Sequence, residues 1–278
     1  MLLRPFSQVD VFTDTPYRGN PVAVVLDASG ISTEAMQHFN HWTNLSEATF
    51  VLPPTAPEAD YRVRIFCPSQ ELPFAGHPTL GTCHAWLASG GKPKGATIVQ
   101  ECGVGLVHIR QDGSRLAFAA PPLRRNTPLD DNDVALIARG LGIARADIVH
   151  HAWCDNGPPW HGVMLRSAAQ VLALQADAAL LAGLFIGVVG PHEAGNACAF
   201  EVRAFFPGNN GLTEDPVTGS LNAALAQWLI GAGLARDRYV AAQGTAMARA
   251  GRVHIERDGD TIWVGGDSVT CIDGTVSL

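Results

Sequence analysis

The sequence predicts an α+β protein built from two similar halves, in each of which short strands curl around one buried helix. Three observations support this prediction: many short strand-like runs, two helix-compatible stretches without a charged residue, and an ordered repeat that relates the halves. The chain has 278 residues, of which 47% are hydrophobic and 16% are charged. This length allows two domains of ordinary size, each with its own core.

Strand-like runs are separated by Gly, Pro and Asp, which favour turns. The runs in the first part of the chain are NPVAVVLD, EATFVLP, YRVRIFC, ATIVQE, GLVHIRQ and RLAFAAP. One amphipathic helix is predicted at STEAMQHFNHW, where Ser32 or Thr33 caps the first turn. Residues 121–133 form a linker rich in Pro and charge, and a helix begins at its acidic end. Later elements are a strand at FEVRAFFP and a hairpin with an Asp-Gly turn at GRVHIERDGDTIWVGG.

Two stretches carry no Asp, Glu, Lys or Arg. They are residues 72–91, LPFAGHPTLGTCHAWLASGG, and residues 216–235, PVTGSLNAALAQWLIGAGLA. Their length suggests membrane spans, but Gly, Pro, Thr, Ser, His and Asn interrupt the apolar runs. A helix that is apolar on all sides and buried within a protein fits better, so no membrane contact is predicted.

The two stretches belong to a repeat. RIFCPSQELPFAGHPTLGTCHAWLASGG and RAFFPGNNGLTEDPVTGSLNAALAQWLIGAG share Arg, Phe, Pro, a polar loop, Gly and a chargeless helix with one Trp. Phe66 aligns with Phe205, and Gly76 aligns with Gly219. Such a repeat predicts internal duplication with pseudo-twofold symmetry. The expected domains are 1–119 and 120–266, and an alternative returns residues 267–278 to the first domain.

The predicted site lies at the N-terminal ends of the two chargeless helices, here called the helix mouths. A helix N-terminus offers free N–H groups and partial positive charge, which bind carboxylates. If the halves face each other, two mouths grip a small acid in the cleft between them and stabilise an enolate-like anion. The candidate acids and bases are Glu47, His77 and Asp215, and Thr218 and Ser220 can donate hydrogen bonds at the second mouth.

Structural roles compete with these catalytic ones. Glu47 equally fits a strand-edge carboxylate. His77 equally fits a helix cap or a core histidine. Asp215 precedes a proline and fits a turn or N-cap. Glu214, its neighbour, is a further acidic candidate.

Several function classes lack support. The net charge of −7 argues against an electrostatic nucleic-acid binder. The six Cys form no C-x-x-C pair and the His residues have no ligand-like spacing, so no metal site is predicted. There is no P-loop, dinucleotide fingerprint or G-x-S-x-G elbow. The N-terminus lacks the apolar core of a signal peptide, and a cytoplasmic location is the simplest expectation.

Five segments resemble the PhzF family of phenazine-biosynthesis isomerases, within the diaminopimelate epimerase-like fold. They are VDVFTDTPYRGNPVAVVLDA, NLSEATFVLPP, ELPFAGHPTLGTCHAWL, EDPVTGSLNAALAQWL and QGTAMARAGRVHI. The resemblance covers nearly the whole chain. It implies two domains, each a barrel-like, mostly antiparallel sheet around a central helix, with the active site in the cleft between them.

The resemblance also implies roles. Glu47 matches the catalytic glutamate, His77 the GHPT histidine and Asp215 the aspartate of EDPVTGS. Gly76, Gly219 and Ser220 match the substrate-binding loops of the family. Acid/base isomerisation without metal or organic cofactor, often in a homodimer, is implied as well.

Related epimerases use paired Cys at the helix mouths. Here these places hold Ala75-Gly76-His77 and Thr218-Gly219-Ser220, so a two-thiol racemase is not expected. Other departures, at Cys67, Cys102 and Ala250, lie outside the proposed acid/base set. The expected function is a proton shift on a small carboxylate-bearing metabolite with Glu47 as general base and acid. The alternatives are an epimerase or racemase without paired thiols and a non-catalytic binder of small acids.

Overall fold

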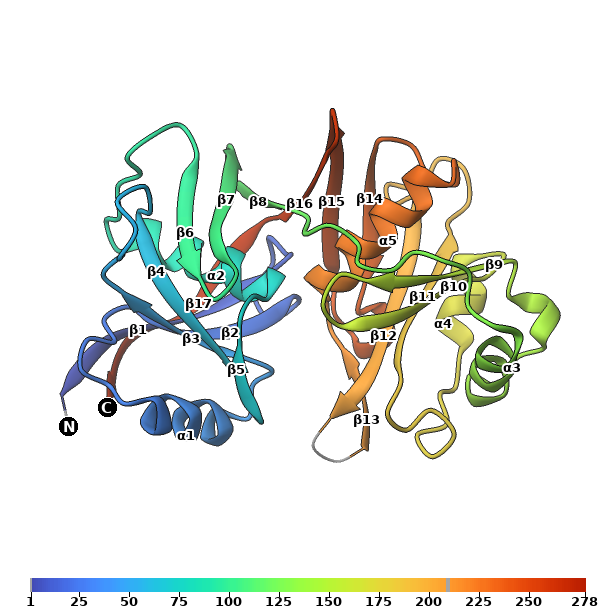
Figure 1. Ribbon diagram of the computed structural model, residues 1–278, viewed down its shortest axis with the longest axis horizontal. Helices are drawn as coiled ribbons and strands as arrows, with labels where there is room; N and C mark the ends of the chain where they lie inside the picture. The colour runs from blue at the N-terminus through green and yellow to red at the C-terminus, as the bar shows by residue number, and fades with distance from the viewer. Residues whose placement is uncertain (1, 209–210) are drawn as a thin grey trace. The chain divides into compact units, whose positions relative to one another are not determined.

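The computed structural model describes residues 2–208 and 211–278; Asn209 and Asn210, in the polar loop of the second repeat copy, lie outside the described residues. The chain divides into two compact units, Met1–Ala119 with Gly265–Leu278, and Ala120–Val264. Both units combine a mixed sheet with few helices (Figure 1), which confirms the predicted α+β class.

The first unit contains two helices and the N- and C-terminal strands. Its helices are α1 (Thr33–Thr43) and α2 (Gly76–Ala88). Its strands are β1 (Leu3–Val11), β2 (Asn20–Val25), β3 (Ala48–Leu52), β4 (Tyr61–Cys67), β5 (Gln70–Leu72), β6 (Ile98–Cys102), β7 (Gly105–Asp112), β8 (Arg115–Ala119) and β17 (Ser268–Ser277). Antiparallel pairs β1–β2, β3–β4, β4–β5, β6–β7, β7–β8 and β1–β17 are joined by parallel pairs β2–β3 and β4–β6.

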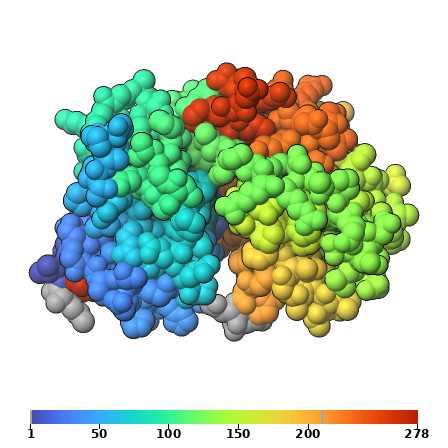
Figure 2. All heavy atoms as spheres, in the orientation of Figure 1, coloured from blue at the N-terminus to red at the C-terminus, as the bar shows by residue number. Residues whose placement is uncertain are grey.

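Helix α2 lies within this sheet, as the chargeless sequence predicts. It contacts β1, β2, β3, β8 and β17. Its first turn has no acidic residue and its last turn no basic residue, unlike the turns of many surface helices. Pro78 occupies the first turn, where its missing N–H breaks no helical hydrogen bond. Helix α1 instead lies at the surface (Figure 2) and is capped by Ser32, whose hydroxyl accepts from the Ala35 N–H.

The described residues of the second unit form three α-helices and a further set of strands. Its helices are α3 (Asp131–Gly140), α4 (Ala168–Ala173) and α5 (Gly219–Gly231), with short 3-10 turns at Arg145–Asp147 and Thr245–Met247. Its strands are β9 (His150–Asp155), β10 (Pro159–Met164), β11 (Phe185–Pro191), β12 (Phe200–Gly208), β13 (Gly211–Asp215), β14 (Arg238–Gln243), β15 (Gly251–Asp258) and β16 (Thr261–Gly266). The last two flank the predicted Asp-Gly turn.

The strand pairing of the first unit recurs in the second. Pairs β9–β10, β11–β12, β12–β13 and β14–β15 are antiparallel, and pairs β10–β11 and β12–β14 are parallel. Phe66 faces Glu71 across β4–β5, and Phe205 faces Glu214 across β12–β13. The predicted alignment of the two Phe residues therefore holds in the register of both hairpins, and α2 and α5 begin at the two aligned glycines.

Several strands were not predicted from the sequence. β1 contains Pro5, which lowers its strand signal. β17 has no buried residue, so it lacks apolar alternation. β9 begins with two His residues and was equally inconspicuous. These strands are stabilised by pairing with distant partners, for example β1 with β17, which a local sequence pattern does not report.

The packing of α2 gives a first testable prediction. A Cβ atom added at Gly81 would lie 2.4 Å from Cγ1 of Val22 and 3.0 Å from Cγ2 of Val11, both in β-branched side chains with little freedom to move. We expect Gly81→Ala to lower the free energy of unfolding by about 1–3 kcal/mol, measured by urea denaturation. Gly231→Ala, at the end of α5, is the control because its added Cβ meets no atom within 4 Å, and it should not destabilise the protein.

Candidate functional site

The first unit brings together Asn20, Glu47 and His77, here named the Glu47 cluster. His77 is the second residue of α2, Glu47 immediately precedes β3, and Asn20 begins β2. The imidazole Nε2 lies 3.3 Å from Oε2 of Glu47, and Nδ1 lies 3.5 Å from the amide nitrogen of Asn20. Two residues predicted from separate motifs therefore meet, and Asn20 joins them.

Asn20 is positioned by the loop between β1 and β2. The carboxylate of Asp10, which is buried, accepts a hydrogen bond from the Gly19 N–H at 2.9 Å. A Cβ atom at Gly19 would lie 2.3 Å from the carbonyl oxygen of Val11, so only glycine fits this turn. The buried carboxylate and the glycine together fix the start of β2.

Burial controls the charge of His77. Its side chain is 6% exposed, and desolvation lowers its pKa to about 3, although a backbone hydrogen bond to Pro21 acts in the opposite direction. At neutral pH the ring is therefore uncharged, and its contact with Glu47 joins a neutral imidazole to a carboxyl group. A neutral imidazole has one N–H and one lone pair, so it can either donate or accept a proton.

The lowered pKa predicts how His77 affects stability. The unfolded chain binds a proton at this ring below pH 6.5, whereas the folded protein binds it only near pH 3. Stability therefore falls as the pH drops through this window. Between pH 7 and pH 5 the wild type should lose about 2 kcal/mol of unfolding free energy that His77→Asn does not lose.

Urea denaturation at the two pH values measures this difference. His38→Asn is the control, because the His38 ring is exposed and its replacement should leave the pH dependence unchanged. An equal loss in the wild type and His77→Asn would show that the His77 ring becomes charged in the folded protein.

The second unit holds Asp215, Thr218, Asn222 and Gln243 together, here named the Asp215 cluster. The Thr218 hydroxyl donates to Oδ2 of Asp215 at 2.6 Å and accepts from the Gln243 amide at 3.0 Å. Oε1 of Gln243 accepts from the Thr218 N–H at 3.0 Å and from Asn222 at 2.7 Å. Strand β14 thus supplies a side chain that orders the first turn of α5.

Of the predicted residues in the second unit, Ser220 lies outside this cluster. Its Oγ accepts from the indole nitrogen of Trp160 at 3.2 Å, and its carbonyl accepts from Asn156 at 2.9 Å. Asn20, Asn156, Trp160 and Gln243 were not identified as site residues, because their contacts with the helices come from distant segments. Asn20 lies in the segment VDVFTDTPYRGNPVAVVLDA and Gln243 in QGTAMARAGRVHI, and the family resemblance of these segments was the available signal.

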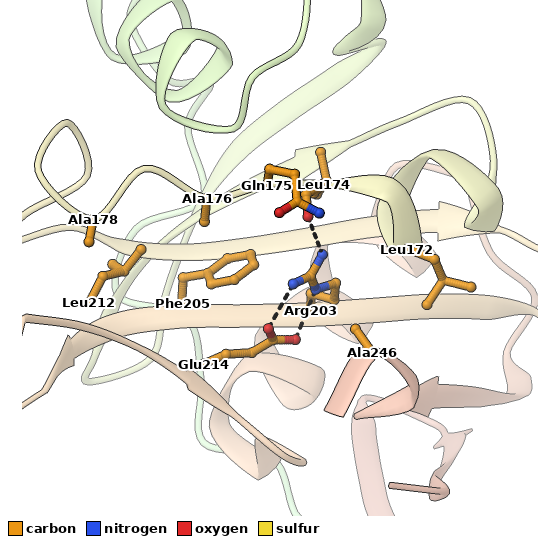
Figure 3. A pocket seen from close by; sticks show the side chains of 10 residues that line it. All are labelled: Leu172, Leu174, Gln175, Ala176, Ala178, Arg203, Phe205, Leu212, Glu214 and Ala246. Atoms are coloured by element: carbon orange, nitrogen blue, oxygen red, sulfur yellow. Dashed lines mark hydrogen bonds and ion pairs between the residues drawn. The ribbon is translucent and has the colours of Figure 1, made fainter. Parts of the chain in front are cut away.

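Glu214 is not a free acid. It forms a bidentate ion pair with Arg203, at 2.8 and 2.7 Å, on one wall of a pocket of about 420 Å³ (Figure 3). Arg203 also donates to the carbonyl of Leu174 and lies over the ring of Phe205. A carboxylate paired in this way with a buried arginine has a structural role, so Glu214 is not carried forward as an acid or base.

The first unit has the same arrangement. Arg64 forms a bidentate pair with Glu71 at 2.7 and 2.6 Å, lies over Phe66, and donates to Thr33 of α1. In each unit the pair joins the two strands of the hairpin that precedes a central helix. It therefore helps to set the position of the helix mouth.

The cysteines, a metal site and membrane-spanning helices are the remaining features to consider. The Cys83 thiol is buried in α2, and burial raises its pKa to about 12, so it packs as a neutral thiol. All six cysteines lie in the described residues and none forms a disulfide. Across residues 2–208 and 211–278, no group of three His, Cys, Asp or Glu is arranged to hold a metal ion. No described helix has the length and apolar character of a membrane span.

Comparison with known proteins shows the family of this chain. The family model described as phenazine biosynthesis-like protein matches residues 9–274. The chain belongs to this PhzF family. The trans-2,3-dihydro-3-hydroxyanthranilate isomerase of Pseudomonas aeruginosa is 34% identical, over 90% of this chain and 89% of that protein. Antisense-enhancing sequence 1 of Schizosaccharomyces pombe is 36% identical over 97% of each chain.

A solved structure shows the same fold. The PhzF-family phenazine biosynthesis protein of Bacillus anthracis matches with a TM-score of 0.83 and 21% identity, covering 100% of both chains. PhzF-family relatives of this chain are named isomerases, and the chain is an isomerase of this family. The predicted family and enzyme class are confirmed.

Proposed function

We propose that this PhzF-family protein shifts a proton between carbon atoms of a small carboxylate-bearing metabolite, without a metal or organic cofactor. Glu47 acts as the general base that removes the proton and as the acid that returns it. The observation that carries the proposal is the 3.3 Å contact between Glu47 and a buried His77 that desolvation keeps neutral. A carboxyl group beside a neutral proton donor or acceptor suits general acid/base chemistry.

His77 orients Glu47 and shares its proton. Because the ring is neutral, it does not hold Glu47 in a permanent ion pair, and the carboxyl group can change its protonation state during the reaction. Asn20 lies on the other ring nitrogen and restricts the orientation of the imidazole. A fixed ring keeps proton transfer within hydrogen-bond reach.

The Asp215 cluster serves the same substrate in this proposal. Asp215 orders Thr218, whose backbone and neighbours Gly219 and Ser220 form the first turn of α5. Gly76 begins the corresponding turn of α2. Both turns present N–H groups and the positive end of a helix dipole, which stabilise a carboxylate and the negative charge that develops on it.

The substrate class follows from two arguments. Helix N-termini favour an acid, and the Pseudomonas aeruginosa relative is named for trans-2,3-dihydro-3-hydroxyanthranilate, a cyclic carboxylate. We therefore propose a dihydro-hydroxyanthranilate or a related small cyclic or amino acid. We further propose that the two units arose by duplication and form the two domains, and that the enzyme is a cytoplasmic homodimer.

A solvent-exchange screen tests the function. The enzyme is incubated in D₂O with trans-2,3-dihydro-3-hydroxyanthranilate and a panel of small cyclic and amino acids, and products are followed by mass and NMR. An isomerase gives a deuterated product with a shifted double bond. Inversion at one carbon would instead identify an epimerase, and binding without exchange would identify a binding protein.

A further inference from the structure

The β9–β10 hairpin lies beside α5 within the second unit (Figure 1). Two of its side chains hold the first turn of this helix. Trp160 donates its indole N–H to Oγ of Ser220 at 3.2 Å. Asn156 donates its amide Nδ2 to the carbonyl oxygen of Ser220 at 2.9 Å. Both contacts converge on the second residue of the helix.

Trp160 occupies one lone pair of the Ser220 hydroxyl and leaves its hydrogen available to donate. A serine hydroxyl has one hydrogen and two lone pairs, whereas an indole N–H can only donate. Trp160 therefore uses a lone pair of Ser220, and the hydroxyl hydrogen points away from the indole. Among the residues that the structure describes, this hydrogen has no acceptor. A carboxylate oxygen is a suitable partner.

Asn156 offers a hydrogen-bond acceptor, whereas Ser220 offers a donor. Its amide orientation is set because only the nitrogen can face the carbonyl of Ser220. The other amide atom, Oδ1, is buried and has no hydrogen-bond partner in the described part of the chain, and Asn156 as a whole is 9% exposed. Buried acceptors in native proteins nearly always have a donor, so the Oδ1 atom of Asn156 is suited to accept from an N–H or O–H group of a ligand.

The first unit contains a matching arrangement. Its helix also has an asparagine beside the second residue, since Asn20 lies against His77. Asn20 begins β2, whereas Asn156 lies in the β9–β10 connection, and the β1–β2 and β9–β10 hairpins occupy the same place in the strand pairing of their units. The recurrence favours a role for Asn156 at the helix mouth over incidental packing.

We infer that Asn156 accepts a hydrogen bond from an amino or hydroxyl group beside the substrate carboxylate, while Ser220 donates to the carboxylate. The inference rests on the proposed function, which places the carboxylate at the first turn of α5. An acceptor and a donor held side by side select acids that carry such a group and discriminate against acids that lack it. Asn156 is thus a specificity-determining residue.

Calorimetric titration of the full chain with anthranilate and benzoate tests this inference, because the two acids differ by one amino group. The wild type should bind anthranilate about tenfold more tightly. Asn156→Ala should bring the ratio close to one while benzoate affinity changes little. A purely structural role would weaken both ligands equally and preserve the ratio. Asn156→Gly also removes the amide and provides a second measurement of the ratio if the alanine variant does not fold.

Two further variants complete the design. Trp160→Phe, which frees the Ser220 hydroxyl to rotate, should weaken both acids by the same few-fold factor and keep their ratio. Asn132→Ala, at an exposed position of helix α3, should change neither affinity. A wild type without preference for anthranilate, including one that binds neither acid, or an Asn156 variant that keeps the preference, would overturn the inference. Binding requires no turnover, so this result is distinguishable from failure of the proposed proton transfer.

Discussion

Glu47→Gln should reduce kcat roughly a thousandfold, because general base catalysis typically contributes 10²–10⁴ to the rate. Glutamine keeps the size of the side chain and its contact with His77, but it cannot accept a proton from carbon. We expect the free energy of unfolding and the affinity for the substrate to change little. The effect should therefore appear in kcat rather than in KM.

The control for this variant is Glu58→Gln, an exposed carboxylate in the same unit. It should retain the rate of the wild type. Near-native turnover by Glu47→Gln would exclude Glu47 as the base. Loss of folding in the variant, detected by circular dichroism, would instead indicate a structural role for the carboxylate.

Glu214→Gln should have the largest effect on stability. The side chains of Arg203 and Glu214 are 9% and 17% exposed, and removal of the negative charge leaves a buried guanidinium without its counter-ion. Breaking a buried pair in this way costs about 3 kcal/mol or more. Urea denaturation measures the loss.

Glu71→Gln is a matched control, because the Arg64–Glu71 pair has the same bidentate geometry and the same place in its hairpin. Its side chains are 25% and 40% exposed, so water screens the charges and the cost should stay below about 1 kcal/mol. Equal losses in the two variants would contradict the conclusion that burial, rather than geometry, determines the contribution of each pair.

The central helices could be predicted because their sequences are unusual in themselves. A stretch of about twenty residues without charge must avoid water, and Gly76 and Gly219 recur at corresponding places in the repeat. The strands around them were harder to recognise. β17 has no buried residue and β9 begins with two His residues, so neither sequence shows a clear alternation of apolar and polar residues.

Some candidate residues could likewise be predicted from local motifs, whereas others depend on partners from distant segments. Glu47 and His77 were predicted from separate motifs, and their 3.3 Å contact adds the geometry. Glu214 illustrates the limit of local sequence, because its partner Arg203 lies eleven residues away across a hairpin. Asn156 and Trp160 lie more than fifty residues from Ser220, and only the folded sheet brings them to α5.

The most direct test of Glu47 as the proton carrier compares carbon–deuterium exchange by the wild type and Glu47→Gln on the same substrate in D₂O. The substrate is trans-2,3-dihydro-3-hydroxyanthranilate, or the member of the acid panel that the wild type converts. The wild type should incorporate deuterium at carbon, whereas Glu47→Gln should bind the acid and incorporate none above the uncatalysed rate. Exchange by Glu47→Gln at the rate of the wild type would contradict this role of Glu47.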